Sequence, residues 1–400
     1  MASRYIDKDS PWLLALLAAL VALGPLSVDM YLPAMPAMKV ALNTDISHMH
    51  LTLSVYLAGF ALFHLACGPL ADRYGRKPVL TAGTALFVLA CLGCAQSTTV
   101  EQLLVFRFFQ GVGACVGPTL ARTITRDVFG PTRAARALSL IAMLMALGPA
   151  VAPTLGGFLL LILPWPIIFG FLAVYGATMV VLLQIFLAES LPQRQSLHPV
   201  AIARNYGKLI ADPAYLSVTL ASGMIYAALL TYLSSSSFVY IDMLSVPVQY
   251  FGFIFLTTVA GYMGGSGLSA RLAAVHASEQ IILLGSSFTL LSTAAMWLGN
   301  TLFPTSIWVL MIPMVLFSVG MGLTLPHSMA IALRPFSHIA GTASSLLGFI
   351  QMGLSGVASA TVGALLTDSP EPMLAGMFFI SLAAVILCWR VYRQYRATNP

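Results

Sequence analysis

Ser27-Val28-Asp29-Met30-Tyr31-Leu32-Pro33-Ala34 lies inside the first long apolar segment of the chain, residues 12–37. Asp29 is the one acidic residue that we place at membrane depth. An ionisable group in hydrocarbon costs roughly 2.5–3.5 kcal/mol on insertion scales, so intramembrane acids usually serve a function. We therefore take Asp29 as the centre of the candidate site.

The composition of the 400-residue chain indicates an integral membrane protein. It is 59% hydrophobic and 8% charged, whereas soluble domains are about 25% charged. Apolar segments of about 20 residues, long enough to cross a bilayer core as helices, recur along the chain, and the alternating segments of about 10 residues typical of β-barrels do not appear. The first apolar segment is too long for a cleavable signal peptide and lacks a small-residue cleavage site, so we expect it to remain as a helix.

The pattern predicts an all-α membrane protein with twelve transmembrane helices. We place them at residues 12–37, 49–70, 79–97, 102–124, 135–161, 165–188, 214–238, 248–271, 280–298, 305–333, 340–366 and 372–392.

Lys and Arg placement predicts the orientation, because loops rich in these residues are cytoplasmic. The cations on one side are Arg4, Lys8, Arg73, Arg76, Lys77, Arg126, Arg133, Arg136, Arg194, Arg204, Lys208, Arg271, Arg334, Arg390, Arg393 and Arg396. The opposite loops hold Lys39 among acids. We expect a multi-pass protein of the inner (plasma) membrane with both termini in the cytoplasm. The asymmetry also explains the net charge of +6, so we expect no nucleic-acid partner.

The longest polar stretch falls near the middle of the chain, at residues 189–213, with six predicted spans on either side. We therefore predict an N-terminal six-helix half at 1–188, a cytoplasmic linker at 189–213 and a C-terminal six-helix half at 214–400. This layout is typical of transporters with internal repeats.

A dense basic turn, Gly68-Pro69-Leu70-Ala71-Asp72-Arg73-Tyr74-Gly75-Arg76-Lys77-Pro78, joins the second and third predicted spans. Gly75 can take a positive φ and end one helix, and Pro78 suits the first turn of the next. We expect the Asp72 carboxylate to meet the N-terminal amides of another helix. The candidate gating residues are Gly68, Asp72, Arg73, Gly75, Arg76 and Lys77. The alternative is an ordinary basic turn that satisfies the positive-inside rule.

The fifth predicted span contains Gly148-Pro149-Ala150-Val151-Ala152-Pro153-Thr154-Leu155-Gly156-Gly157. Pro149 and Pro153 remove helix hydrogen bonds and permit bending. Gly148, Gly156 and Gly157 allow a neighbouring helix to approach closely. For any single glycine, generic membrane packing is the alternative explanation.

Together these motifs resemble a known family. The basic turn resembles the signature of the major facilitator superfamily between helices two and three, and Leu104-Val105-Phe106-Arg107-Phe108-Phe109-Gln110-Gly111 resembles its fourth-helix pattern with an intramembrane arginine. The segment 148–157 is similar to the fifth-helix antiporter motif, with Ala152 where many members have Gly. With the stretch around Asp29, Arg126-Asp127 and residues 336–345, the chain resembles the bicyclomycin/chloramphenicol-resistance (Bcr/CflA) branch of proton-driven drug exporters.

The resemblance implies the major facilitator fold, a working monomer and a first-helix acid that couples transport to protons. A neighbouring guanidinium favours the ionised form of a carboxylate and desolvation favours the protonated form, so Asp29 beside Arg107 can act as a proton switch. Arg107 is also a candidate substrate contact. The alternative for the two residues is a structural ion pair that joins helices one and four.

Histidines and Gln110 are further candidates. His64, His327 and Gln110 are possible proton-relay or substrate contacts, although lone helical histidines are more often packing residues. His48 and His50 are predicted to be solvated at a helix entrance, and His338 to be a cap or gate residue. The five cysteines all fall in apolar segments, and no βαβ context surrounds the CxxC spacing of Cys91 and Cys94. We expect no metal and no cofactor.

Aromatic and methionine side chains suit varied apolar ligands. The candidate substrate-cavity residues are Tyr31, Tyr56, Met224, Tyr226 and Tyr232, with Phe238 and Met263 as further members. Core and lipid-facing positions remain alternatives for each of them.

These features predict a proton-coupled exporter of small, partly apolar compounds such as chloramphenicol- or bicyclomycin-like drugs. The alternatives are a siderophore or metabolite exporter, a proton-coupled nutrient symporter, and a membrane sensor. The chain lacks the HExxH, P-loop and GxSxG patterns in their required settings, so we expect no enzyme.

Overall fold

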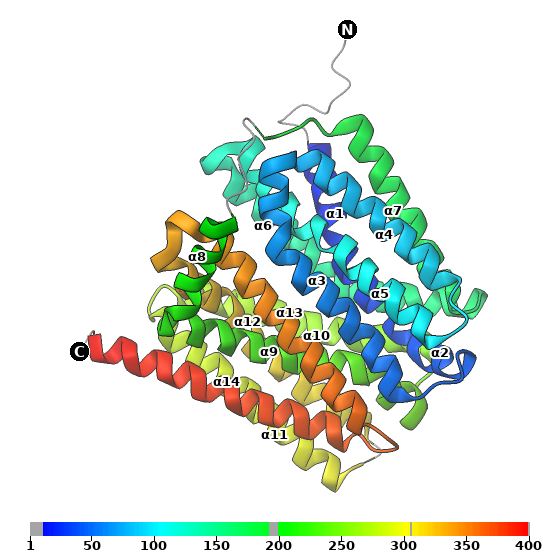
Figure 1. Ribbon diagram of the computed structural model, residues 1–400. Helices are drawn as coiled ribbons and strands as arrows, with labels where there is room; N and C mark the ends of the chain where they lie inside the picture. Colours follow the sequence, from blue (N-terminus) through cyan, green and yellow to red (C-terminus); the bar gives the residue numbers. More distant parts are fainter. Residues whose placement is uncertain (1–10, 192–198, 305, 399–400) are drawn as a thin grey trace. The chain divides into compact units, whose positions relative to one another are not determined.

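The computed structural model describes residues 11–191, 199–304 and 306–398, and this part of the chain is built from helices (Figure 1). The cations Arg4, Lys8 and Arg194 lie outside the described residues, as do the side chains of Arg126, Arg133, Arg136 and His338.

The chain divides into two compact units. One comprises Met1–Thr44 and Val55–His198, and the other comprises Asp45–Ser54 and Pro199–Pro400. The helix α3 (Ile46–Tyr74) therefore gives its first turns to the second unit and its remainder to the first. The division at 1–188, 189–213 and 214–400 stays a prediction; within the predicted linker, 192–198 lie outside the described residues and Pro199–Ala211 forms the helix α8.

The first unit holds α1 (Pro11–Asp29), the 3₁₀-helix η1 (Leu32–Ala34), α2 (Met35–Ala41), most of α3, α4 (Arg76–Ala95), α5 (Val100–Ala114), α6 (Val116–Ile162) and α7 (Pro166–Phe186). Here α1 packs against α6, and α4 packs against both α5 and α7 (Figure 1).

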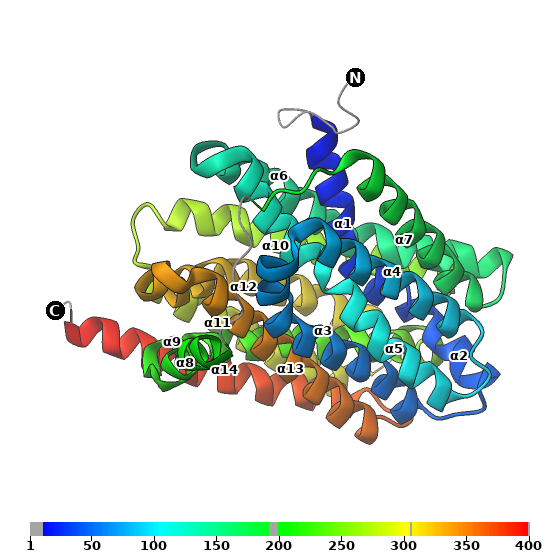
Figure 2. The same cartoon turned by 45° about the horizontal axis from the view of Figure 1, so that its top comes forward.

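The second unit holds α8, α9 (Pro213–Ser237), the π-helix η2 (Phe238–Met243), α10 (Val248–Leu272), α11 (Ser278–Leu302), α12 (Ile307–Leu333), the 3₁₀-helix η3 (Arg334–Ile339), α13 (Ala340–Leu365) and α14 (Glu371–Thr398). Within it α9 packs against α13 and α14, and α12 packs against α10 and α11 (Figure 2).

Eleven helical segments of the described residues are long and apolar enough to cross a membrane, so the predicted count of twelve is not confirmed. The difference lies at the fourth and fifth predicted spans, which α6 joins into one helix from Val116 to Ile162. Its last apolar stretch, Gly148–Ile162, is shorter than the others. The polar residues between the two spans were predicted to form a loop, but Arg and Ala at 133–137 are strong helix formers and the helix continues through them.

A side-chain cap starts α3. The Oδ1 atom of Asp45 accepts a hydrogen bond from the backbone N–H of His48 at 2.8 Å. This backbone hydrogen bond holds the pKa of Asp45 below its ordinary value of 3.8, because it stabilises the carboxylate.

Asp45→Ala is expected to lower the stability of the protein by about 1 kcal/mol near neutral pH, the usual effect of losing an N-cap. A carboxyl group with a lowered pKa in the folded state stabilises the fold above its unfolded-state pKa, and this contribution disappears as the pH falls through its folded-state pKa. The difference in melting temperature should therefore shrink below about pH 4. Asp45→Asn, a neutral cap, should keep most of the stability and lose the pH dependence in this range; an equal loss in both variants would contradict the capping role.

Candidate functional site

The first predicted span is interrupted beside Asp29. The helix α1 ends at this residue, and the chain continues through the short η1 turn into α2. Pro33 and Pro36 provide no backbone N–H, which prevents a regular continuation of the hydrogen-bond ladder. The Leu26 carbonyl in the last turn of α1 still accepts the Met30 N–H at 3.2 Å, whereas the Asp29 carbonyl has no i+4 donor because Pro33 lacks an N–H. Broken helices at membrane depth are a common place for transporter binding sites.

Asp29 is almost completely buried, with an exposed fraction of 3%. No side chain that the structure describes forms an ion pair or a hydrogen bond with its carboxyl group. An unpaired charge is expensive to keep in such surroundings.

Arg107, on α5, is completely buried. Its Nη1 atom donates to Oε1 of Gln110 at 2.6 Å and to the backbone oxygen of Ser27 at 3.3 Å. The guanidinium carbon lies 4.3 Å from the ring centre of Tyr31 and 4.5 Å from that of Tyr56. These distances are those of cation–π contacts.

Two nitrogens of the same guanidinium, Nε and Nη2, are buried and have no hydrogen-bond partner among the described residues. A guanidinium carries five N–H donors and cannot lose its charge in a protein. Arg107 therefore holds unused donors against an aromatic wall, a combination suited to a ligand with a hydrogen-bond acceptor and an apolar surface.

The structure thus brings Arg107 together with Gln110, Tyr31 and Tyr56, which are all candidate site residues from the sequence. It does not join Arg107 to Asp29 by an ion pair. Instead Arg107 reaches the carbonyl of Ser27, two residues before Asp29. Phe169 on α7 is a contact that the sequence analysis missed, with its ring centre 5.9 Å from the guanidinium carbon. No signal in the sequence points to Phe169, whereas Pro33 is a signal for the helix break.

The other cavity candidates lie on α9, η2 or α10, in the second unit. Tyr232 is buried and its hydroxyl lies 2.9 Å from that of Tyr240. Met224 and Tyr226 are half-buried, and Met263 is 51% exposed. Phe238 is buried against the ring of His50.

Both relay candidates among the histidines are hydrogen-bonded packing residues in this structure. The ring of His64 stacks on Phe60, and its Nδ1 lies 3.4 Å from Oγ1 of Thr119. The Nδ1 atom of His327 lies 3.0 Å from the Oγ atom of Ser278. These contacts agree with the alternative given for both residues.

The basic turn forms a charge cluster with residues that follow much later in the chain. Arg76 pairs with Asp72 and, through Nε, with Asp127 at 3.3 Å. The carboxylate of Glu189 accepts the backbone N–H groups of Arg76 at 3.0 Å and Lys77 at 3.3 Å. It therefore caps the N-terminus of α4, where an anion is favoured.

The expectation that the Asp72 carboxylate meets the N-terminal amides of another helix stays a prediction; the partner that the structure gives it is Arg76, at the start of α4. Gly75 has a φ of 109° and faces Glu189 so closely that a Cβ atom would lie 2.5 Å from Oε2. Glycine is required here for both reasons. A side chain at Gly68 would meet nothing within 4 Å. Arg73 lies with its guanidinium carbon 5.3 Å from the ring centre of Tyr74.

The Pro-Gly segment of α6 packs on the helix that carries Asp29. A Cβ atom at Gly148 would lie 3.0 Å from Pro25, and one at Gly156 would lie 2.5 Å from the backbone oxygen of Met30. Gly157 and Pro153 are buried and Pro149 is half-buried. The segment therefore supports the break in the first span at the residue next to Asp29.

Gly156→Ala is expected to lower the stability of the protein by about 1–3 kcal/mol, because the added methyl group must displace the backbone at Met30. Gly170→Ala on α7 is the matched control, since a Cβ atom there meets nothing within 4 Å. Melting temperatures of the purified variants measure the difference. Equal melting temperatures would show that α6 does not pack on the break as described.

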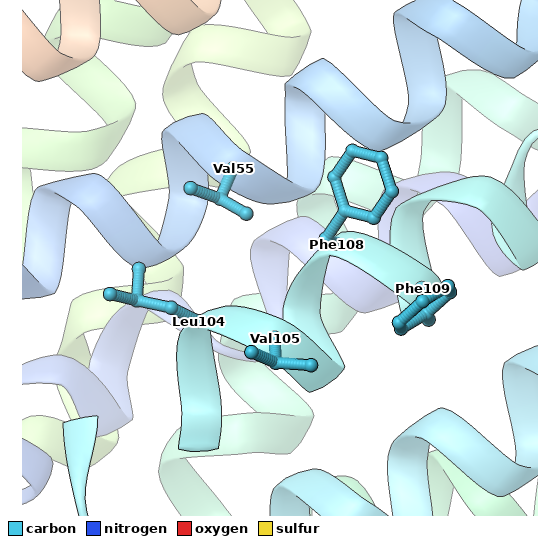
Figure 3. Close-up of a pocket in the computed structure, with 5 residues that line it drawn as sticks. All are labelled: Val55, Leu104, Val105, Phe108 and Phe109. Atoms are coloured by element: carbon cyan, nitrogen blue, oxygen red, sulfur yellow. The ribbon is translucent and has the colours of Figure 1, made fainter. Parts of the chain in front are cut away.

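One apolar pocket of about 280 Å³ lies on the first unit, between α3 and α5. Figure 3 shows its lining side chains, Val55, Leu104, Val105, Phe108 and Phe109. None of them is polar, so the pocket offers no group for acid–base chemistry or for specific recognition.

Comparisons with known proteins agree with this architecture. The family model described as Major Facilitator Superfamily matches residues 17–360. An uncharacterized MFS-type transporter, YdgK of Bacillus subtilis, is 32% identical over 93% of both chains. A bicyclomycin resistance protein homolog of Haemophilus influenzae is 28% identical over 90% of this chain and 91% of its own. The multidrug resistance protein MdtL of Escherichia coli O81 is 31% identical over 84% of both chains.

Solved transporter structures share the fold at low sequence identity. The nucleoside transporter NupG superposes with a TM-score of 0.77 at 13% identity, covering 95% of this chain and 98% of its own. A peptide transporter, POT, gives a TM-score of 0.76 at 17% identity, covering 96% of this chain and 94% of its own. The expected resemblance to the Bcr/CflA branch is confirmed by the relatives. The chain belongs to the Major Facilitator Superfamily and is a multi-pass membrane transporter, not an enzyme.

Proposed function

We propose that this transporter is an antiporter that moves small, partly apolar compounds out of the cell in exchange for protons, with Asp29 as the proton-binding group. The observation that supports this most directly is the burial of Asp29 at a helix break with no described cation beside it. An ionised carboxylate there needs water, a donor or a cation. A proton neutralises it when these are absent.

The arrangement around Arg107 supports a role in substrate recognition. Its unpartnered Nε and Nη2 donors favour a cargo with a carbonyl or another acceptor, and Tyr31 and Tyr56 favour apolar or aromatic surface beside it. Drug-like compounds combine these properties. The names of the bicyclomycin-resistance and multidrug-resistance relatives agree with such a cargo.

Cargo binding and proton binding are coupled in this proposal through the end of α1. Arg107 contacts the carbonyl of Ser27 in the last turn of that helix, and Asp29 ends it. A substrate that draws the Arg107 donors away from Ser27 changes the surroundings of Asp29. Exchange then follows if water reaches Asp29 alternately from the two sides of the membrane.

The proposal includes the inner membrane as location, twelve spans in two six-helix halves, cytoplasmic termini and a working monomer. A siderophore or metabolite exporter uses the same proton chemistry and differs in cargo. The antiporter-like segment 148–157 favours export over nutrient uptake.

The test is substrate-driven proton movement in proteoliposomes. The purified protein is reconstituted with a pH-sensitive dye and one chloramphenicol- or bicyclomycin-like compound inside. The same concentration of that compound is present outside, and an inward proton gradient is imposed. We expect at least one compound to accelerate collapse of the gradient and to move against its own gradient. Cargo movement that is insensitive to the proton gradient would exclude proton coupling.

A further inference from the structure

The first turns of α3 carry a histidine that is completely buried. His50 has an exposed fraction of 0%, whereas the side chain of His48 is 49% exposed. The prediction that both are solvated is therefore wrong for His50. Successive helix residues are rotated by about 100°, so residues two apart face opposite sides. The Ile46–Ser54 segment packs within the second unit, and His50 lies on the packed side.

The surroundings of the His50 ring fix its protonation. Nδ1 lies 3.2 Å from the backbone oxygen of Ser359 on α13. A carbonyl only accepts hydrogen bonds, so Nδ1 carries the hydrogen and Nε2 presents a lone pair. Nε2 is buried and none of the described residues donates to it. The hydroxyl groups of Ser359 and of Ser237, next to Phe238, are also buried without a described partner.

The packing around the ring is close on two sides. The ring stacks on Phe238 at a centroid distance of 5.7 Å and an interplanar angle of 22°. On α13, Gly363 approaches so closely that a Cβ atom there would overlap the imidazole. The pocket thus fits a neutral imidazole and has little free space.

No carboxylate on the packed elements contacts the ring within the described chain. The sequence of α13 contains no titratable residue, and α9 contains only Tyr215, Tyr226 and Tyr232. On η2 the titratable residues are Tyr240, which bonds Tyr232, and Asp242, which is exposed. Directly before α3, Asp45 pairs with His48.

We propose that Nε2 of His50 is a second proton-binding site of this transporter, and that its protonation releases Ile46–Ser54 from α13 and η2. An imidazolium here is a buried charge without a counter-charge in contact, which the packed arrangement does not stabilise. Proton uptake therefore favours an arrangement in which this segment is exposed to water. The role of the site in exchange rests on the proposed function, whereas proton binding at His50 does not.

Hydrogen–deuterium exchange of the full chain in lipid nanodiscs tests the proposal. After correction for intrinsic rates, peptides covering residues 45–54 should exchange up to about tenfold faster near pH 5.5 than near pH 7.5, because local opening exposes their amides and a histidine with an ordinary pKa takes up its proton in this range. His50→Gln and His50→Asn keep an amide donor for Ser359 and cannot be protonated, so both should lose this response. His48→Gln is the matched control and should keep it.

Equal exchange at the two pH values in the wild-type protein overturns the proposal, as does a response that persists in both His50 variants. Asp29→Asn separates this site from the proposed function. The response should survive in that variant; its loss would assign the proton to Asp29 and also overturn the proposal. No cargo is needed for any of these measurements.

Discussion

Asp29→Asn is expected to abolish substrate-driven proton movement in proteoliposomes, down to the level of protein-free liposomes. Asparagine has nearly the same shape as aspartate and cannot bind and release a proton, so only the coupling step is removed. The burial of Asp29 without a described cation makes an uncharged side chain acceptable there. The melting temperature should therefore stay at the wild-type value or rise.

Substrate counterflow distinguishes coupling from a structural role. Exchange of labelled for unlabelled cargo across a membrane without a pH gradient does not require proton release, so Asp29→Asn should retain it. Asp368→Asn replaces an exposed acid in the same way and should behave as wild type. Loss of counterflow together with a lower melting temperature would mean that Asp29 stabilises the fold and does not carry the proton.

Arg107→Gln is expected to weaken cargo binding by about tenfold to a hundredfold, equivalent to about 1.4–2.8 kcal/mol. This is the range for the loss of a charge-assisted hydrogen bond together with a cation–π contact. Arg107→Lys should recover little of this binding, because an ammonium group offers fewer donors and does not stack flat on Tyr31 and Tyr56. Binding is measured by titration calorimetry or by protection of the melting temperature.

The control for charge is Arg204→Gln on α8, which removes an exposed cation. It should bind cargo as the wild type does. If Arg107→Gln binds cargo normally but melts at a much lower temperature, Arg107 is a structural residue. Its contacts with the Tyr31 and Tyr56 rings and with the Ser27 carbonyl then serve to hold the end of α1 and the helix α3 against α5. In that case the hydrogen bond from Arg107 to the Ser27 carbonyl would be the contact that stabilises the fold.

Much of the membrane architecture can be predicted from the sequence because its signals are local. Apolar segments of bilayer length and the placement of Lys and Arg locate most of the spans. Residue types also indicate the chemistry of two further regions. These are the turn 68–78 and the group formed by Arg107, Gln110, Tyr31 and Tyr56. The prediction that Asp29 lies at membrane depth rests on one acidic residue within one long apolar segment.

The remaining features depend on contacts between distant residues. Glu189 looks like the start of a polar linker until the backbone of α4 comes within hydrogen-bond distance of it. Phe169 is one apolar residue among many, and only the packing of α7 places it near Arg107. His50 and His48 cannot be told apart by composition, because the face of a helix that becomes buried depends on its neighbours. The continuous α6 shows that a polar stretch need not be a loop.

The cap that Glu189 forms on α4 has a practical consequence for dividing this polypeptide into two co-expressed fragments. A division directly after Leu187 would remove the acceptor for the amides of Arg76 and Lys77 from the first fragment. A division after Leu191 keeps it. Fragments cut at the later position should reassemble in better yield, and a reporter protein inserted there should disturb the basic turn least.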